Sequence, residues 1–203
     1  MPRLKKILHV GCGPNRLRHI KARFNPHEWK EIRFDIDPAV EPDIIGTLTD
    51  MRKVGSGCVD AIFSSHNIEH LYPHEVPVAL AEFLRVLNDD GFALITCPDL
   101  QSVCRLIAEG RLTDPAYNSP VGPITPLDIL YGHRPQLAAG NMYMAHHCGF
   151  TRKSLQTALC SAGFKSVAAK ARPGAFDLWA LASKKPRTEG RMRTLALEYF
   201  PEA

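Results

Sequence analysis

The chain has 203 residues, a formal net charge of +4 and 45% hydrophobic residues. These values suit one soluble globular domain that is large enough to bury a core. The small charge argues against a nucleic-acid partner, and the basic segment 184–193 is interpreted as solvated surface. No apolar run approaches the length of a membrane span, so no membrane partner is expected.

The chain contains six cysteines, and no two of them form a Cys-x-x-Cys pair. In a chain of this length, such cysteines are typical of reduced thiols rather than of a disulfide framework. The N-terminal residues lack the apolar core of a signal peptide. The sequence therefore predicts a cytoplasmic protein.

Strand and helix patterns alternate through the first half of the chain. Strands are predicted at residues 7–10, 32–36, 43–48, 60–64 and 92–96. Helices are predicted at residues 16–24, 75–87 and 100–109. The polar turn 88–91, which ends in Gly91, is expected to stop the second of these helices.

The second half of the chain begins with an unusual segment. Residues 113–149 contain five prolines and no sustained period, which predicts a long functional or mobile loop. Thr151 is expected to cap a helix that Gly163 closes. Two final strands, 167–171 and 176–183, must pair antiparallel, because a parallel crossover needs a dozen or more residues.

Together these elements predict an α/β fold. Alternating strands and helices favour a doubly wound, mostly parallel sheet of seven strands with helices on both faces. The last two strands end that sheet as an antiparallel hairpin. We expect residues 1–203 to form a single domain, with residues 113–149 as a lid or substrate insertion.

A glycine turn and a carboxylate indicate a nucleoside-containing cofactor. Gly11-Cys12-Gly13 follows the first strand, and Asp35 lies at the end of the second. The glycines let the backbone approach a ligand, and the acid can accept hydrogen bonds from ribose hydroxyls. Arg16 occupies the position where a dinucleotide fingerprint has glycine or alanine, which disfavours a nicotinamide dehydrogenase.

Over almost its whole length the chain resembles the class I S-adenosylmethionine-dependent methyltransferases. Segments 8–13, 34–38 and 48–51 resemble the family's first three motifs. Segments 59–71 and 82–91 resemble its fourth strand and the helix and turn before the fifth, and segments 147–151 and 161–164 bracket a late helix. The resemblance implies a Rossmann-like methyltransferase fold with S-adenosylmethionine as cofactor and S-adenosylhomocysteine as product.

The resemblance also implies a set of cofactor-binding residues. In it Asp35 holds the ribose, Asp50 and its neighbour line the adenine pocket, and the end of the fourth strand faces the cofactor. The set comprises Val10, Gly11, Cys12, Gly13, Asn15, Asp35, Ile36, Asp50, Met51, Ser64, Ser65 and His66. The acceptor is expected to be a small or medium-sized molecule, and no catalytic residue is assigned, because positioning supplies much of the rate.

Two other features of the sequence leave alternatives open. His66-Asn67-Ile68-Glu69-His70 matches a zinc peptidase pattern, which favours a zinc hydrolase as one alternative. A non-catalytic module that only binds the cofactor is the other. The methyltransferase interpretation assigns no metal site, and it takes its candidate substrate residues from the insertion. These are Tyr131, His133, Tyr143 and His146.

Overall fold

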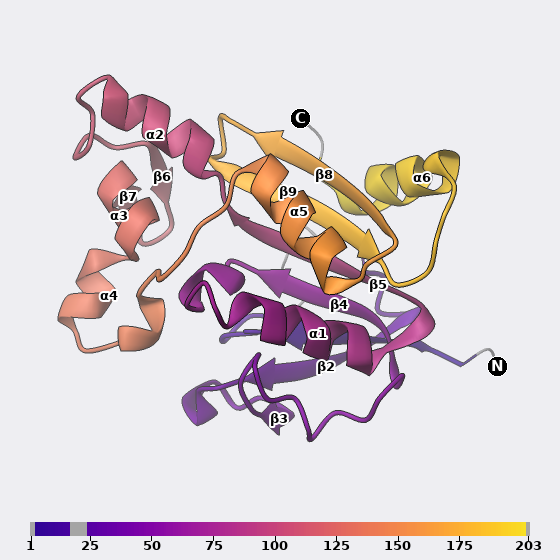
Figure 1. The fold of residues 1–203 in the computed structure, drawn as a ribbon. Coiled ribbons are helices and arrows are strands. Elements are labelled where there is room, and N and C mark those ends of the chain that lie inside the picture. Colours follow the sequence, from indigo (N-terminus) through magenta and orange to yellow (C-terminus); the bar gives the residue numbers. More distant parts are fainter. Residues whose placement is uncertain (1–2, 17–23, 202–203) are drawn as a thin grey trace.

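The computed structural model describes residues 3–16 and 24–201 (Figure 1). In this part of the chain one sheet has seven strands, in the order β3-β2-β1-β4-β5-β9-β8. The strands are β1 (Lys5–Val10), β2 (Trp29–Asp35), β3 (Ile44–Ile45), β4 (Val59–Ser65), β5 (Leu87–Pro98), β8 (Ser166–Arg172) and β9 (Asp177–Ser183). The first five run parallel, and β9 is antiparallel to both of its neighbours. The predicted fold class is confirmed.

Helices cover both faces of the sheet, which is why its central strands are apolar throughout. Side chains alternate between the faces. Leu8 and Val10 of β1 join the core beneath α1 (Val76–Val86) and α5 (Arg152–Ala162), whereas Ile7 joins the core beneath α6 (Glu189–Tyr199). Figure 1 shows α1 and α5 on the same face of the sheet, with α6 behind it.

The helix α6 was not predicted. Its first residues belong to the basic segment 184–193, which was interpreted as solvated surface. Met192, Leu195 and Tyr199 are nevertheless buried, and they pack against the sheet. Their spacing of three and four residues places them on one face of the helix, and the basic residues Arg191 and Arg193 flank Met192 along the chain.

The predicted turn at residues 88–91 is wrong, because these residues belong to β5. The helix α1 ends at Val86, and Leu87 already has extended backbone. Leu87 pairs with Val59 and Phe92 pairs with Ala61, so the polar residues between Leu87 and Phe92 form an irregular bulge in the strand. The predicted strand at 43–48 shortens to β3, and most of the helix predicted at 16–24 lies outside the described residues.

The segment 113–149 is not the structureless loop that its prolines predicted. After α2 (Leu100–Ala108) it contains the strands β6 (Tyr117–Ser119) and β7 (Gly122–Ile124) and the helices α3 (Pro126–Tyr131), α4 (Arg134–Ala138) and η4 (Met142–Met144). Pro126 and Pro135 stand in the first turns of α3 and α4, where a missing N–H is no loss.

The insertion packs against α2 through its own small core. Ile124 and Ile129 contact Val103 of α2, and Thr125 and Asp128 form a capping box at the start of α3. Arg134 binds the same Asp128 carboxylate at 2.7 Å. As predicted, Thr151 caps α5 and Gly163 ends it. No helix among residues 3–16 and 24–201 is long and apolar enough to span a membrane.

We expect Phe83→Ala to lower the free energy of unfolding by about 3–5 kcal/mol, because it opens a cavity beneath α1. Phe83 is fully buried, whereas Val78 on the same helix is 48% exposed. Val78→Ala, the matched control, should change stability by less than about 0.5 kcal/mol. Chemical denaturation of both variants measures the difference, and equal losses would contradict this packing.

Candidate cofactor and acceptor site

The turn after β1 has a backbone that favours glycine. Gly11 and Gly13 both have positive φ angles, of 59° and 52°. A Cβ atom on Gly11 would lie 2.3 Å from Nδ2 of Asn67, which follows β4, whereas a Cβ on Gly13 would meet open space. The turn therefore contacts the end of β4 at Gly11 and faces an open region at Gly13.

Asp35 holds this turn from the end of β2. Its carboxylate is 8% exposed and accepts hydrogen bonds from the backbone N–H of Gly13 at 2.8 Å and of Asp37 at 3.0 Å. A carboxylate offers about four lone-pair sites. Among the described residues Asp35 has no further hydrogen-bond donor, so two of its acceptor positions are available to a ligand such as a ribose.

Arg33 is a structural partner that sequence analysis missed. It lies two residues before Asp35, and its guanidinium, which is 4% exposed, donates to the carbonyls of Gly13, Val40 (3.0 Å) and Glu41 (2.6 Å). It thus joins the glycine turn to the segment that follows β2. A basic residue between the apolar Ile32 and Phe34 was the available signal.

A cavity of about 380 Å³ opens over these residues, within the range typical of ligand pockets. The predicted residues Gly11, Gly13, Asp35, Ile36 and His66 line it. Its remaining lining residues come from the segments after β1, β2, β3 and β4 and from the insertion. They are Pro14, Phe34, Asp37, Val40, Gly46, Thr47, Leu48, Asn67, His70, Leu71, Asn141, Met142, Tyr143, Met144, Ala145 and His147.

The other predicted cofactor residues are not among those that line this cavity. Val10, Cys12 and Ser64 are buried in or beside the sheet, Asn15 is exposed, and Ser65 is bonded to Thr96. Burial raises the pKa of Cys12 to about 11, so its thiol is neutral at pH 7.

Asp50 and Met51 lie on the far side of a turn. The N–H of Asp50 donates to the carbonyl of Thr47, which reverses the chain, and the Asp50 carboxylate binds exposed Arg52 at 2.8 Å. Met51 is fully buried in the core. The structure brings Gly46, Thr47 and Leu48 to the cavity instead.

A second cavity, of about 450 Å³, adjoins the first. His66, His70 and Met144 line both cavities. Among the candidate substrate residues, His133 and His146 line the second cavity and Tyr143 lines the first. Tyr131 is 61% exposed and is not among the residues that line either cavity.

The half-exposed His66 and the buried Glu69 form an ion pair at the second cavity. Glu69 is 1% exposed, and His66 Nδ1 lies 3.4 Å from Glu69 Oε1. Burial raises the pKa of Glu69, but the neighbouring His66 outweighs this, so the pKa is lowered and the carboxyl group is ionised. Burial lowers the pKa of His66, but Glu69 more than offsets that effect and the pKa is raised.

The zinc peptidase pattern does not form the α-helix that it requires. Only Ile68–His70 are helical, as the single turn η3, and His66 precedes them with a φ of 49°. His66 and His70 therefore do not share one face of an α-helix. The zinc-hydrolase interpretation loses its geometric basis.

Comparisons with known proteins agree with the fold and with the glycine turn. Residues 8–95 match the family described as a methyltransferase domain. No curated protein matches the sequence. The match includes β1, Asp35 and β4, the elements that build the first cavity.

Many solved structures share this fold. An S-adenosylmethionine-dependent methyltransferase from Archaeoglobus fulgidus is 12% identical over 88% of this chain and 86% of its own, with a TM-score of 0.56. Another from Methanosarcina mazei is 15% identical over 90% and 92%, also at 0.56. The 1,6-didemethyltoxoflavin N1-methyltransferase of Burkholderia thailandensis is 16% identical over 91% and 72%, at 0.56. At such identities the likeness shows the fold.

Residues 8–95 therefore match a methyltransferase domain, and the sheet has the fold of S-adenosylmethionine-dependent methyltransferases, in agreement with the resemblance. The cavity described above fits S-adenosylmethionine, the cofactor that the resemblance implies. Asp35 retains acceptor positions for ribose hydroxyls, and the space at Gly13 is open.

We expect Arg33→Met to weaken the binding of S-adenosylhomocysteine at least tenfold, because a hydrogen bond from a charged donor contributes about 1.5–3 kcal/mol. The variant loses all three bonds that join the glycine turn to residues 40 and 41. Isothermal titration calorimetry measures the affinity. Arg52→Met, which removes an exposed arginine paired with Asp50, is the control and should bind normally. Equal affinities in both variants would contradict the role of Arg33.

Proposed function

We propose that the first cavity holds S-adenosylmethionine with its ribose at Asp35. The two free acceptor positions of that carboxylate support this placement. The turn Gly11–Gly13 then lies against the methionine part of the cofactor. Ile36 and Leu48 offer apolar contacts at the edge of the cavity, where the adenine would lie.

We further propose that the second cavity holds a small-molecule methyl acceptor. The observation that carries this proposal is that His66, His70 and Met144 line both cavities. When bound, the cofactor supplies an electrophilic methyl group on its sulfonium. Methyl transfer is an in-line displacement, so the acceptor atom must approach the methyl group from the side opposite the sulfur. The adjoining position of the two cavities supports that arrangement.

The residues at the shared boundary position the acceptor and exclude water. Met144 belongs to the insertion, so the insertion contributes to both cavities. This supports a role for residues 113–149 as a lid on a single methyltransferase domain. The chain's modest charge of +4 favours a small molecule over a nucleic acid as the acceptor, and its six free cysteines favour a cytoplasmic location.

We expect wild-type protein to bind S-adenosylhomocysteine saturably and Asp35→Ala to bind at least tenfold more weakly. The variant removes the proposed ribose contacts and the acceptor of the Gly13 N–H, each worth about 1.5–3 kcal/mol for a charged partner. Isothermal titration calorimetry checks both. Asp114→Ala, at an exposed acid of the insertion, is the control. A wild-type protein that does not bind S-adenosylhomocysteine would overturn the assignment of the first cavity.

We expect His133→Ala and His146→Ala to reduce turnover while leaving the affinity for S-adenosylhomocysteine unchanged, because both residues line only the second cavity. A screen of small-molecule acceptors, read out by release of S-adenosylhomocysteine, identifies a substrate for the comparison. Unchanged turnover in both variants would remove the second cavity as the acceptor site. Cofactor binding without turnover of any acceptor would favour the non-catalytic module.

A further inference from the structure

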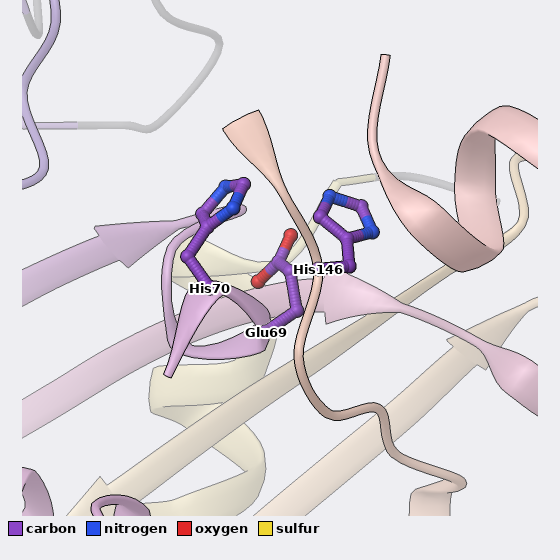
Figure 2. Close-up of side chains that lie close together, drawn as sticks. All are labelled: Glu69, His70 and His146. Atoms are coloured by element: carbon purple, nitrogen blue, oxygen red, sulfur yellow. The ribbon is translucent and has the colours of Figure 1, made fainter. Parts of the chain in front are cut away.

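Three side chains at the second cavity bring together the ligand atoms of a metal site. Glu69 and His70 come from η3, and His146 comes from the insertion. Their candidate ligand atoms all lie within 4.8 Å of one another. Figure 2 shows the Glu69 carboxylate directed into the space between the two imidazole rings. All three residues line the second cavity.

Both imidazole rings are held in the tautomer that a metal needs. Nδ1 of His70 lies 3.0 Å from the carbonyl oxygen of Ala145, and Nδ1 of His146 lies 2.8 Å from that of Ile129. A carbonyl oxygen only accepts, so in each ring Nδ1 is the donor and Nε2 keeps its lone pair. Metal-binding histidines almost always donate their other N–H to a carbonyl or carboxylate in this way.

The carboxylate between these rings lacks hydrogen bonds. Neither oxygen of Glu69 accepts one from a described residue, although the side chain is 1% exposed. The 3.4 Å contact with His66 is an ion-pair distance without hydrogen-bond geometry. Burying a carboxylate without hydrogen bonds costs free energy unless a further partner binds it.

The other two carboxylates that line the second cavity already have strong partners. Asp128 binds Arg134 at 2.7 Å, and Asp177 binds Arg172. Glu69 is therefore the carboxylate of this cavity that has no arginine partner among the described residues, and a ring nitrogen of each of two histidines lies within 4.8 Å of it. That combination attracts a cation.

We propose that Glu69, His70 and His146 bind one divalent transition-metal ion of the zinc class. Two histidines and one glutamate form a common ligand set of catalytic zinc sites, which leave the fourth position open. Zinc bonds of 2.0–2.1 Å require tetrahedral ligand atoms about 3.4 Å apart. The three candidate ligand atoms lie within 4.8 Å of one another, so small side-chain rotations bring them to that spacing. The open position faces the second cavity.

The role of this ion rests on the proposed function. An acceptor hydroxyl at the open position has its pKa lowered by the metal and releases its proton to solvent. The oxygen lone pair then forms the bond to the methyl carbon. The electrons of the broken carbon–sulfur bond return to sulfur, and neutral S-adenosylhomocysteine leaves. This role requires an acceptor with an ionisable proton, such as that of a hydroxyl group.

The test is titration of chelator-treated full-length protein with Zn²⁺ and with Co²⁺, followed by calorimetry and by Co²⁺ visible absorption. We expect one ion per chain and no comparable binding of Mg²⁺, which prefers oxygen ligands. His146→Ala should weaken the affinity at least about 100-fold, since loss of even an outer-shell partner costs 10–100-fold. Glu69→Gln should do the same. His133→Ala, at a histidine of the same cavity outside the cluster, should bind zinc normally.

Two further measurements separate the metal proposal from the proposed function and from the ligand set of the peptidase pattern. S-adenosylhomocysteine titration of each variant shows that it is folded, and it separates failure of the metal proposal from failure of the proposed function. Wild-type protein that binds S-adenosylhomocysteine but no zinc overturns the metal site alone. Zinc binding that is lost in His66→Ala and kept in His146→Ala would also overturn it, since the ligands would then be those of the peptidase pattern.

Discussion

The candidate site depends on the backbone of Gly13. Its N–H donates to Asp35, and its carbonyl accepts from Arg33. Both partners come from the same face of β2, because side chains two residues apart in a strand point the same way. The parallel register pairs Val10 with Phe34, so β1 ends where Asp35 begins to face the turn. Sheet register thereby sets the shape of the cofactor cavity.

The turn η3 links that cavity to the rest of the molecule. The backbone carbonyl of Glu69 accepts the N–H groups of His147 and Cys148, so the end of the insertion is tied to the segment that follows β4. Gly132 lets the insertion fold back closely enough, since a Cβ there would lie 2.0 Å from the carbonyl oxygen of Met144. These contacts bring Met144 and His146 to the boundary between the two cavities.

Local sequence patterns predicted the secondary structure correctly where one interaction determines the conformation of the segment. A continuous apolar run predicts a buried strand such as β1, and a short Pro-Gly turn forces an antiparallel hairpin such as β8 and β9. These patterns gave wrong predictions where one residue type is compatible with two different structures. Proline breaks helices but also starts them, so α3 and α4 were interpreted as loop. A polar stretch that ends in glycine stops a helix but can also bulge from a strand, as residues 88–91 do.

The sequence by itself determined the order of strands and helices, the glycine turn and the acid at the end of β2, because these depend on neighbouring residues. It also carried the family resemblance. Only the tertiary structure decided that Gly46–Leu48 rather than Asp50 reach the cavity, that Arg33 binds the glycine turn, and that His146 meets Glu69. The contacts of Arg33 and His146 join residues far apart along the chain, so no local spacing identifies their partners, and the turn at Thr47–Asp50 decides which side of it faces the cavity.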